Sequence, residues 1–340
     1  MNITRILTTN VRLCPGRITT SVHNLYKNQL QCCCGDNSKR QFSLQSSVES
    51  VAKTQSGIFQ SISESTPVEY AQKLLLNIHE TTGLPWWATI VSTTILMRAT
   101  ITFPLAIYQN YILAKVENLS LEMPAIAKEL KKEIGVAVRL YKWDEKMAKM
   151  QYKLTMKKEW NKLIVRDNCH PVKSSLLLWF QIPMWVSLSV SLRNLVYQLP
   201  NQDFTAKMTL TELSVGGFGW IPNLVEVDSS LILPVTLGLI NLAIIEIQTL
   251  SKVNVPSKLQ RYATNFFRGF SVLMIPIAAS VPSCMALYWT TSSAFGLVQN
   301  MILMSPKVKK SFNIPLTASQ LEKPYAHLLA AMKHKYLPIK

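Results

Sequence analysis

Residues 86–108 read WWATIVSTTILMRATITFPLAIY, and this apolar run decides the fold. An α-helix rises about 1.5 Å per residue, so roughly 20 apolar residues cross the hydrocarbon core of a bilayer. Arg98 lies near the middle of the run, too far from either end for its guanidinium to reach the membrane surface easily. A charge at that depth costs roughly 2.5–3.5 kcal/mol on insertion scales, so we expect Arg98 to face a polar cavity. The alternative is an arginine that snorkels toward the surface or pairs structurally with a neighbouring helix.

Four more apolar stretches follow the first and bring the number of predicted membrane spans to five. They are residues 171–194, 229–247, 266–280 and 284–304. The chain is 48% hydrophobic with a mean hydropathy of +0.15, which fits a membrane protein with sizeable polar loops. The sequence therefore predicts an all-α polytopic membrane protein.

An amphipathic helix is predicted just before the first span, over residues 66–82. Thr66 is the expected N-cap, Pro67 the first helical residue and Glu69 the acid of a capping box, while Gly83 ends the helix. Its apolar face carries Val68, Ala71, Leu74, Leu75 and Ile78. We expect this helix to lie on the membrane surface, and the alternative is packing against a soluble partner.

About sixty residues between the first two spans, 110–170, are rich in charge but keep an apolar helical period. The period breaks at Tyr141, Lys142 and Trp143, and Asp144 can cap a new helix. The segment therefore predicts two antiparallel helices. We expect this solvated hairpin to contact a ribosome, a substrate or a partner protein.

Charged residues in the loops predict the orientation. Residues 110–170 have a net charge of +5, residues 198–228 have −3, and residues 305–340 hold seven lysines and one glutamate. The positive-inside rule places the hairpin and the C-terminus on the positive side, which is the matrix in a mitochondrion. The formal charge of +17 could mean nucleic acid binding, but the basic residues cluster outside the spans. Topology and anionic lipid explain them better, and we expect no nucleic acid partner.

The first 35 residues contain Arg5, Arg12, Arg17 and Lys27 and no acid. This composition is typical of a mitochondrial transit peptide, and we assign residues 1–55 to such a peptide with its linker. The alternative is a simple basic tail. After processing, five spans place the N-terminus in the intermembrane space.

Residues that could support enzyme chemistry are missing from the predicted spans. The only acid well inside an apolar stretch is Glu246, so an aspartyl-type pair is absent. The six cysteines are scattered and show no ligand spacing for a metal. All histidines fall outside the spans, at His23, His79, His170, His327 and His334. We therefore expect no catalytic residue, no metal and no cofactor.

Polar residues on several spans suggest a different kind of site. Thr94, Arg98 and Thr102 share one face of the first span because they are four residues apart. Other spans add Gln181, Asn241, Gln299 and Asn300. Each alone is more typical of a helix–helix hydrogen bond, but together with the arginine they suit a hydrophilic groove. An anion transporter or channel that uses Arg98 remains an alternative, although the chain shows no internal repeat.

Four motifs within roughly residues 67–304 resemble those of a known protein family. They read LMRATITFPL, NCHPVKSSLLLWFQIPMWVSLSVSLRN, GWIPNLVEVDSSLILPV and MIPIAASVPSCMALYWTTSSAFGLVQN. With them the chain resembles the Oxa–YidC–Alb family of membrane protein insertases. GLPWWATIVSTT, YQNYILAKVENL and VRDNCHP are more similar to the mitochondrial branch that assembles cytochrome c oxidase.

The resemblance implies five helices around a groove that is open to the matrix and to lipid. Arg98 matches the family's groove arginine, which would hold an acidic or polar tail of a substrate while an adjacent apolar segment enters lipid. The implied partners are cytochrome c oxidase subunit 2 as substrate, oxidase assembly factors and inner-membrane lipids. Some relatives carry a long basic coiled coil that docks the ribosome, but here the short tail shows no heptad repeat. We therefore expect no stable ribosome binding. A purely structural assembly scaffold would instead make Arg98 dispensable.

Overall fold

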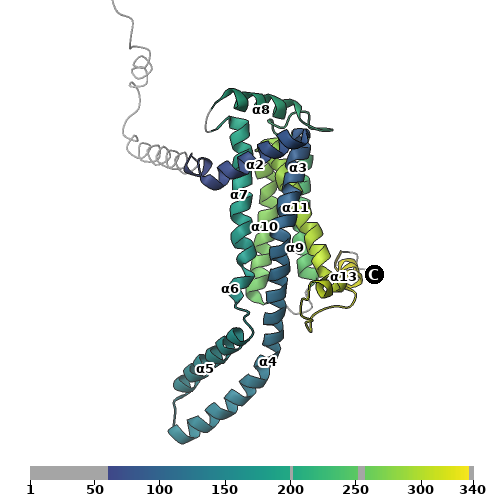
Figure 1. Cartoon of the computed structure of the whole chain (residues 1–340). Coiled ribbons are helices and arrows are strands. Elements are labelled where there is room, and N and C mark those ends of the chain that lie inside the picture. The colour runs from purple at the N-terminus through teal and green to yellow at the C-terminus, as the bar shows by residue number, and fades with distance from the viewer. Residues whose placement is uncertain (1–59, 200–201, 252–256, 337–340) are drawn as a thin grey trace, which may run out of the picture. The chain divides into compact units, whose positions relative to one another are not determined.

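The computed structural model describes residues 60–199, 202–251 and 257–336 (Figure 1). The predicted transit peptide and linker, residues 1–55, lie outside them. Within the described ranges all named elements are helices, and the two isolated bridges build no strand. The all-α class predicted from the sequence is confirmed.

The amphipathic helix α2 spans Thr66–Thr82, and Gly83 ends it in the left-handed conformation, with φ 63°. The predicted start was one residue late, because Ser65 is the N-cap and makes no side-chain capping bond. Glu69 is no capping-box acid either. Its carboxylate accepts a hydrogen bond from Lys73 Nζ at 2.6 Å, an exposed i,i+4 pair of the kind that stabilises helices slightly.

The apolar face of α2 packs against α7 (Leu176–Tyr197). Val68, Ala71 and Leu75 are buried, and the Ser191 hydroxyl of α7 donates to the Val68 carbonyl oxygen at 2.8 Å. Part of the face that the sequence assigned to the membrane surface is therefore covered by the protein itself.

The first predicted span continues into the hairpin as one helical stretch, Trp86–Tyr141, of 56 residues. It comprises α3 (Trp86–Met97), a π-helical turn η1 (Arg98–Thr102) and α4 (Phe103–Tyr141). Pro104 explains the wide turn, since it has no N–H and its ring clashes with the carbonyl four residues earlier. Single π-turns are frequent at functional sites. This one places Arg98 at its first position.

The hairpin consists of the second half of α4 and α5 (Glu145–Arg166), with Asp144 as the N-cap residue that the sequence predicted. A small core of Leu119, Leu163 and Cys169 holds the two helices together. Arg166 Nη2 also pairs with Glu122 at 3.0 Å across the hairpin. Its hydrogen bond to the neighbouring Asp167 lowers the pKa of that carboxyl.

The bundle packs α3 and α7 with α9 (Ile232–Leu250), α10 (Lys258–Ala279) and α11 (Ser283–Met304). Helix α11 is central and contacts α3, α7, α9 and α10. Trp289 of α11 donates from Nε1 to Ser189 Oγ at 2.9 Å and stacks on Trp185. Helix α10 begins eight residues before the predicted fourth span, so the helix is longer than that span.

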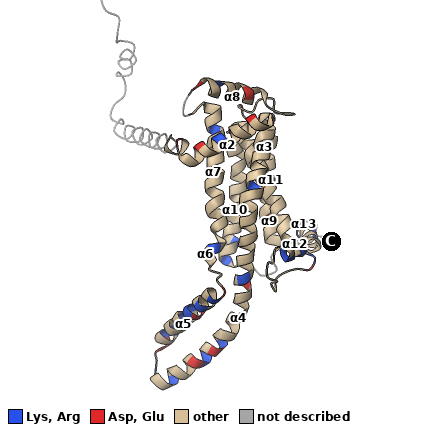
Figure 2. Ribbon diagram, viewed as in Figure 1, with Lys and Arg blue, Asp and Glu red and all other residues tan. Residues whose placement is uncertain are grey.

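Three helical stretches in the described part of the chain are long and apolar enough to cross a membrane: Trp86–Tyr141, Pro171–Tyr197 and Ile232–Leu250. The second combines the short α6 (Pro171–Ser174) with α7. Helices α10 and α11 fall outside this set. Helix α11 does not need a strongly apolar surface, because neighbouring helices cover much of it. Figure 2 shows charged residues mainly on the hairpin and the bundle ends, with few in between.

A helix that the sequence did not predict, α8 (Phe204–Val215), lies in the 198–228 segment at the bundle end opposite the hairpin (Figure 1). Trp86 Nε1 donates to Glu212 Oε2 of α8 at 3.1 Å, and His79 stacks on the Trp86 ring. Beyond α8 in the chain, Asp228 is buried and accepts a hydrogen bond from the Leu233 N–H at 2.9 Å. This bond satisfies a free donor at the start of α9.

The C-terminal residues form two short helices, α12 (Pro306–Ser311) and α13 (Pro324–Tyr336). Lys335 of α13 pairs with Glu246 of α9 at 2.7 Å, and Arg268 of α10 binds the same carboxylate. This segment therefore docks on the helices that precede it.

Candidate functional site

Arg98 is buried within the bundle, with 8% of its surface exposed. Its Nε donates to the Ser292 hydroxyl of α11 at 3.0 Å, and Nη2 donates to the same oxygen. In the described part of the chain no carboxylate lies within ion-pair distance of it. A hydroxyl can orient a guanidinium but leaves its positive charge in place, so the charge remains available to a ligand.

A cavity of about 340 Å³ adjoins Arg98 and is bounded by η1, α4, α7, α9 and α11. We call it the Arg98 cavity. Five of the seven predicted groove residues line it: Arg98, Gln181, Asn241, Gln299 and Asn300. They come from four segments that are far apart in the sequence, and the fold brings them to one place.

Thr94 and Thr102 do not line the cavity. Both are buried, and each donates its hydroxyl to a carbonyl oxygen one turn earlier, Thr94 to Ile90 at 2.6 Å and Thr102 to Arg98 at 2.8 Å. Threonines inside helices commonly satisfy their hydroxyls in this way. The pattern placed them on the arginine's face, but their side chains turn back onto the helix.

Sequence reasoning missed several polar residues of the same cavity. They are Gln109, Asn110, Gln248, Ser292 and Ser293. Helical spacing could have found some of them, because Ser292 lies seven residues before Gln299 and Asn241 lies seven before Gln248. Residues seven apart share one helix face. Ser292 matters most, since it alone is hydrogen-bonded to Arg98 among these five.

Gln299 presents an acceptor to this site. Its Oε1 is buried and has no hydrogen-bond partner within the described residues. Leaving such an atom unpaired costs about 1–3 kcal/mol, so a donor on an incoming segment would relieve that cost. The cavity thus combines the positive charge of Arg98 with acceptors and amides. It is suited to hold a polar or acidic stretch of polypeptide.

No group of three or more His, Cys, Asp or Glu side chains that could hold a metal ion is found among the described residues. The two cysteines that the structure describes, Cys169 and Cys284, are free thiols in buried positions.

The sequence model of one family, described as 60Kd inner membrane protein, matches residues 77–311. The chain belongs to this family. The 60Kd inner membrane protein family is the Oxa–YidC grouping that the motifs predicted, so that resemblance is confirmed. The match covers all five helices of the bundle and the hairpin.

The relatives of this chain include two proteins named cytochrome c oxidase assembly protein COX18, mitochondrial. The one from Mus musculus is 46% identical over 286 residues, which is 84% of this chain and 86% of the relative. The one from Homo sapiens is 44% identical over 282 residues, 83% of this chain and 84% of the relative. The mitochondrial inner membrane protein OXA1L of Mus musculus is 27% identical over 74% of this chain and 52% of its own length.

Proposed function

We propose that this protein is an insertase of the mitochondrial inner membrane that inserts transmembrane segments and exports the C-terminal domain of cytochrome c oxidase subunit 2. The buried, uncompensated charge of Arg98 in a polar cavity is the observation that carries this proposal. The relatives' names describe mitochondrial assembly of cytochrome c oxidase, which supports an oxidase subunit as the substrate. Subunit 2 is the one that the sequence resemblance implies. Oxidase assembly factors and inner-membrane lipids would be its other partners.

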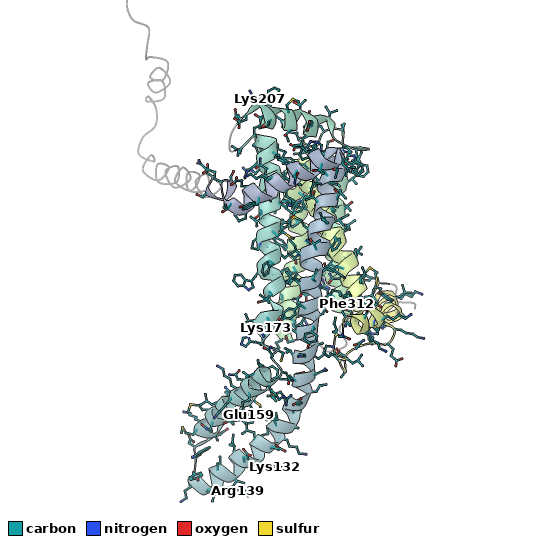
Figure 3. All side chains as sticks on the ribbon, viewed as in Figure 1. Lys132, Arg139, Glu159, Lys173, Lys207 and Phe312 are labelled. Carbon is teal, nitrogen blue, oxygen red and sulfur yellow. The ribbon has the colours of Figure 1, made fainter. Side chains whose placement is uncertain are left out.

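Five spans are part of this proposal. Helices α10 and α11 have 22 residues each, about 33 Å at 1.5 Å per residue, which matches the hydrocarbon core. The hairpin with net +5 and the α8 segment with net −3 lie at opposite ends of the bundle (Figure 3: Lys132 and Arg139 against Lys207). The positive-inside rule then puts the hairpin and the C-terminus in the matrix and the processed N-terminus in the intermembrane space.

The proposed mechanism lowers a barrier and uses no nucleotide. A polar tail that crosses bare lipid must shed its water, whereas the Arg98 cavity offers hydrogen bonds and a fixed positive charge partway across. The adjacent apolar segment meanwhile passes sideways into lipid. A membrane potential that is positive outside favours export of each acidic group by roughly 2.3 kcal/mol per 100 mV.

Reconstituted liposomes test the function. Purified protein in vesicles with a membrane potential should render the C-terminal domain of newly supplied subunit 2 resistant to external protease, and Arg98→Ala vesicles should not. If the same vesicles instead conduct small anions and protect no polypeptide, the protein is an anion channel or transporter. If Arg98→Ala protects the domain as well as the wild type does, a scaffold role replaces the insertase.

A further inference from the structure

A second cavity, of about 250 Å³, adjoins the Arg98 cavity on its hairpin side. Four residues line both of them: Asn110, Gln248, Asn300 and Leu303. The two cavities therefore meet at one ring of side chains, contributed by α4, α9 and α11. A segment that approaches Arg98 through this end of the bundle would pass the second cavity first.

The C-terminal segment builds the outer wall of this second cavity. Residues 312–323, between α12 and α13, have no helix, and we call them the C-terminal strap. Six of its residues line the cavity: Ile314, Pro315, Thr317, Ser319, Gln320 and Leu321. Ile314 is only 5% exposed, so the strap is seated against the bundle and does not trail from it. Figure 3 labels Phe312 where the strap begins, beside the bundle.

Few bonds fasten the strap itself, and the helix that follows it is also tied to α9 by the Lys335–Glu246 ion pair at 2.7 Å. Asn118 Nδ2 of α4 donates to the Leu316 carbonyl oxygen at 3.0 Å, and the Tyr325 hydroxyl donates to the Met301 carbonyl oxygen at 2.9 Å. Both lie at exposed positions, and Phe312 meets Phe103 edge to face with ring centroids 6.2 Å apart. Exposed hydrogen bonds contribute little net stability because water replaces them readily. The strap can therefore leave while the bundle stays folded.

We propose that the C-terminal strap is a lid over the hairpin-side entrance of the Arg98 cavity, and that it must swing away before a polar polypeptide segment reaches Arg98. Loops that open and close a site are drawn from weakly held parts of a structure. The nature of the entering segment rests on the proposed function, whereas the closure itself rests on the cavity walls alone.

The first experiment measures closure without any insertion. The full-length protein first has four cysteines replaced by serine, at Cys14, Cys32, Cys33 and Cys34. The buried Cys169 and Cys284 are kept. Ser293→Cys then places one thiol in the Arg98 cavity. Its reaction with a membrane-impermeant maleimide is compared with and without two loosening changes, Asn118→Ala and Tyr325→Phe. Losing two weak hydrogen bonds should speed labelling by about threefold to tenfold.

The control for that experiment is Glu122→Ala, which breaks an exposed pair in the hairpin away from both cavities. It should leave the labelling rate of Ser293→Cys unchanged. A rate that does not rise in the loosened variant, or that rises equally in the hairpin control, overturns the lid.

The second experiment locks the strap. Asn118→Cys with Leu316→Cys is bridged by a short bis-methanethiosulfonate, which dithiothreitol later removes. Bridging should abolish export of the subunit 2 domain, and reduction should restore it. Glu122→Cys with Arg166→Cys is the matched bridge across the hairpin and should leave export intact.

The two experiments separate the lid from the proposed function. Full export with the strap bridged overturns the lid. If labelling responds to loosening while even the wild type exports nothing, the lid stands and the insertase proposal falls.

Discussion

Arg98 and Ser292 are 194 residues apart in the sequence, yet the guanidinium donates two hydrogen bonds to this one hydroxyl inside the bundle. The π-turn that begins at Arg98 and the central helix α11 bring them together. A neutral partner fixes the direction of the guanidinium and keeps its charge. Had a carboxylate stood in that position, the pair would be neutral and of little use to an acidic substrate.

The first prediction separates function from folding at Arg98. Arg98→Ala should leave the protein level and the thermal unfolding temperature nearly unchanged, because a buried charge adds little to stability. Export of the subunit 2 domain should fall by about tenfold or more, which corresponds to the free energy of one hydrogen bond to a charged group. Arg98→Lys should keep part of the activity, since it keeps the positive charge but loses the fork geometry. Degradation of Arg98→Ala would show instead that the arginine is structural.

The second prediction neutralises Arg98 without removing it. Ser292→Asp puts a carboxylate within reach of the guanidinium, and the resulting ion pair should reduce export as strongly as Arg98→Ala does. Ser293→Asp is the matched control, because this neighbour lines the same cavity while Arg98 donates its hydrogen bonds to Ser292. Export assays on both variants, at equal protein level, decide the matter. Equal losses in the two variants would mean that any added acid harms the cavity.

The third prediction concerns topology. Val215 in α8 and Val165 in α5 are 80% and 78% exposed, so cysteines there are almost equally reachable. In mitoplasts, a membrane-impermeant maleimide should label Val215→Cys and spare Val165→Cys, since the loop charges place α8 outside and the hairpin in the matrix. Detergent should then make both reactive. Labelling of Val165→Cys alone would invert the proposed orientation.

Local patterns in the sequence predicted the helices well. Apolar periodicity located α2 and the hairpin, and the end of α2 at Gly83 follows from the backbone freedom of glycine. The same pattern ends the first span at Tyr108, because it detects where apolar character stops. The backbone stays helical from Trp86 to Tyr141, so the helix itself does not end there.

The features that the sequence did not predict depend on contacts between distant residues. Helix α8 is held by the hydrogen bond between Glu212 and Trp86, which are 126 positions apart, and nothing in the sequence of α8 predicts that contact. The sequence shows the tail only as basic and without a heptad repeat, yet Ile314 and Leu328 are buried in it. Likewise the run TTSSAFG does not reveal that Ser292 is the partner of Arg98.

The fourth prediction tests how α8 is held. Glu212→Ala leaves the indole N–H of Trp86 without its acceptor, and Trp86 is only 1% exposed. We expect a loss of about 1–3 kcal/mol in the free energy of unfolding, the usual cost of an unpaired buried donor. Trp86→Phe removes the donor as well, so the double variant should be less destabilised than the two single losses added together. Denaturant unfolding in detergent measures this, and strict additivity would show that the bond contributes nothing.

The last prediction concerns how the substrate arrives. Residues 305–340 carry seven lysines and no coiled-coil repeat, and we predict that they do not dock stably on a ribosome. Near an anionic membrane each lysine contributes about 1 kcal/mol, which favours a role in orientation and lipid contact. We therefore expect post-translational insertion of few clients, and deletion of the residues after Lys323 should leave subunit 2 export largely working. That deletion removes Tyr325 and Lys335, whose side chains hydrogen-bond α13 to the bundle, but it keeps the C-terminal strap. Co-sedimentation with mitochondrial ribosomes in high salt provides the second measurement. If the intact protein sediments with ribosomes and the shortened one does not, the protein works during translation and serves many clients.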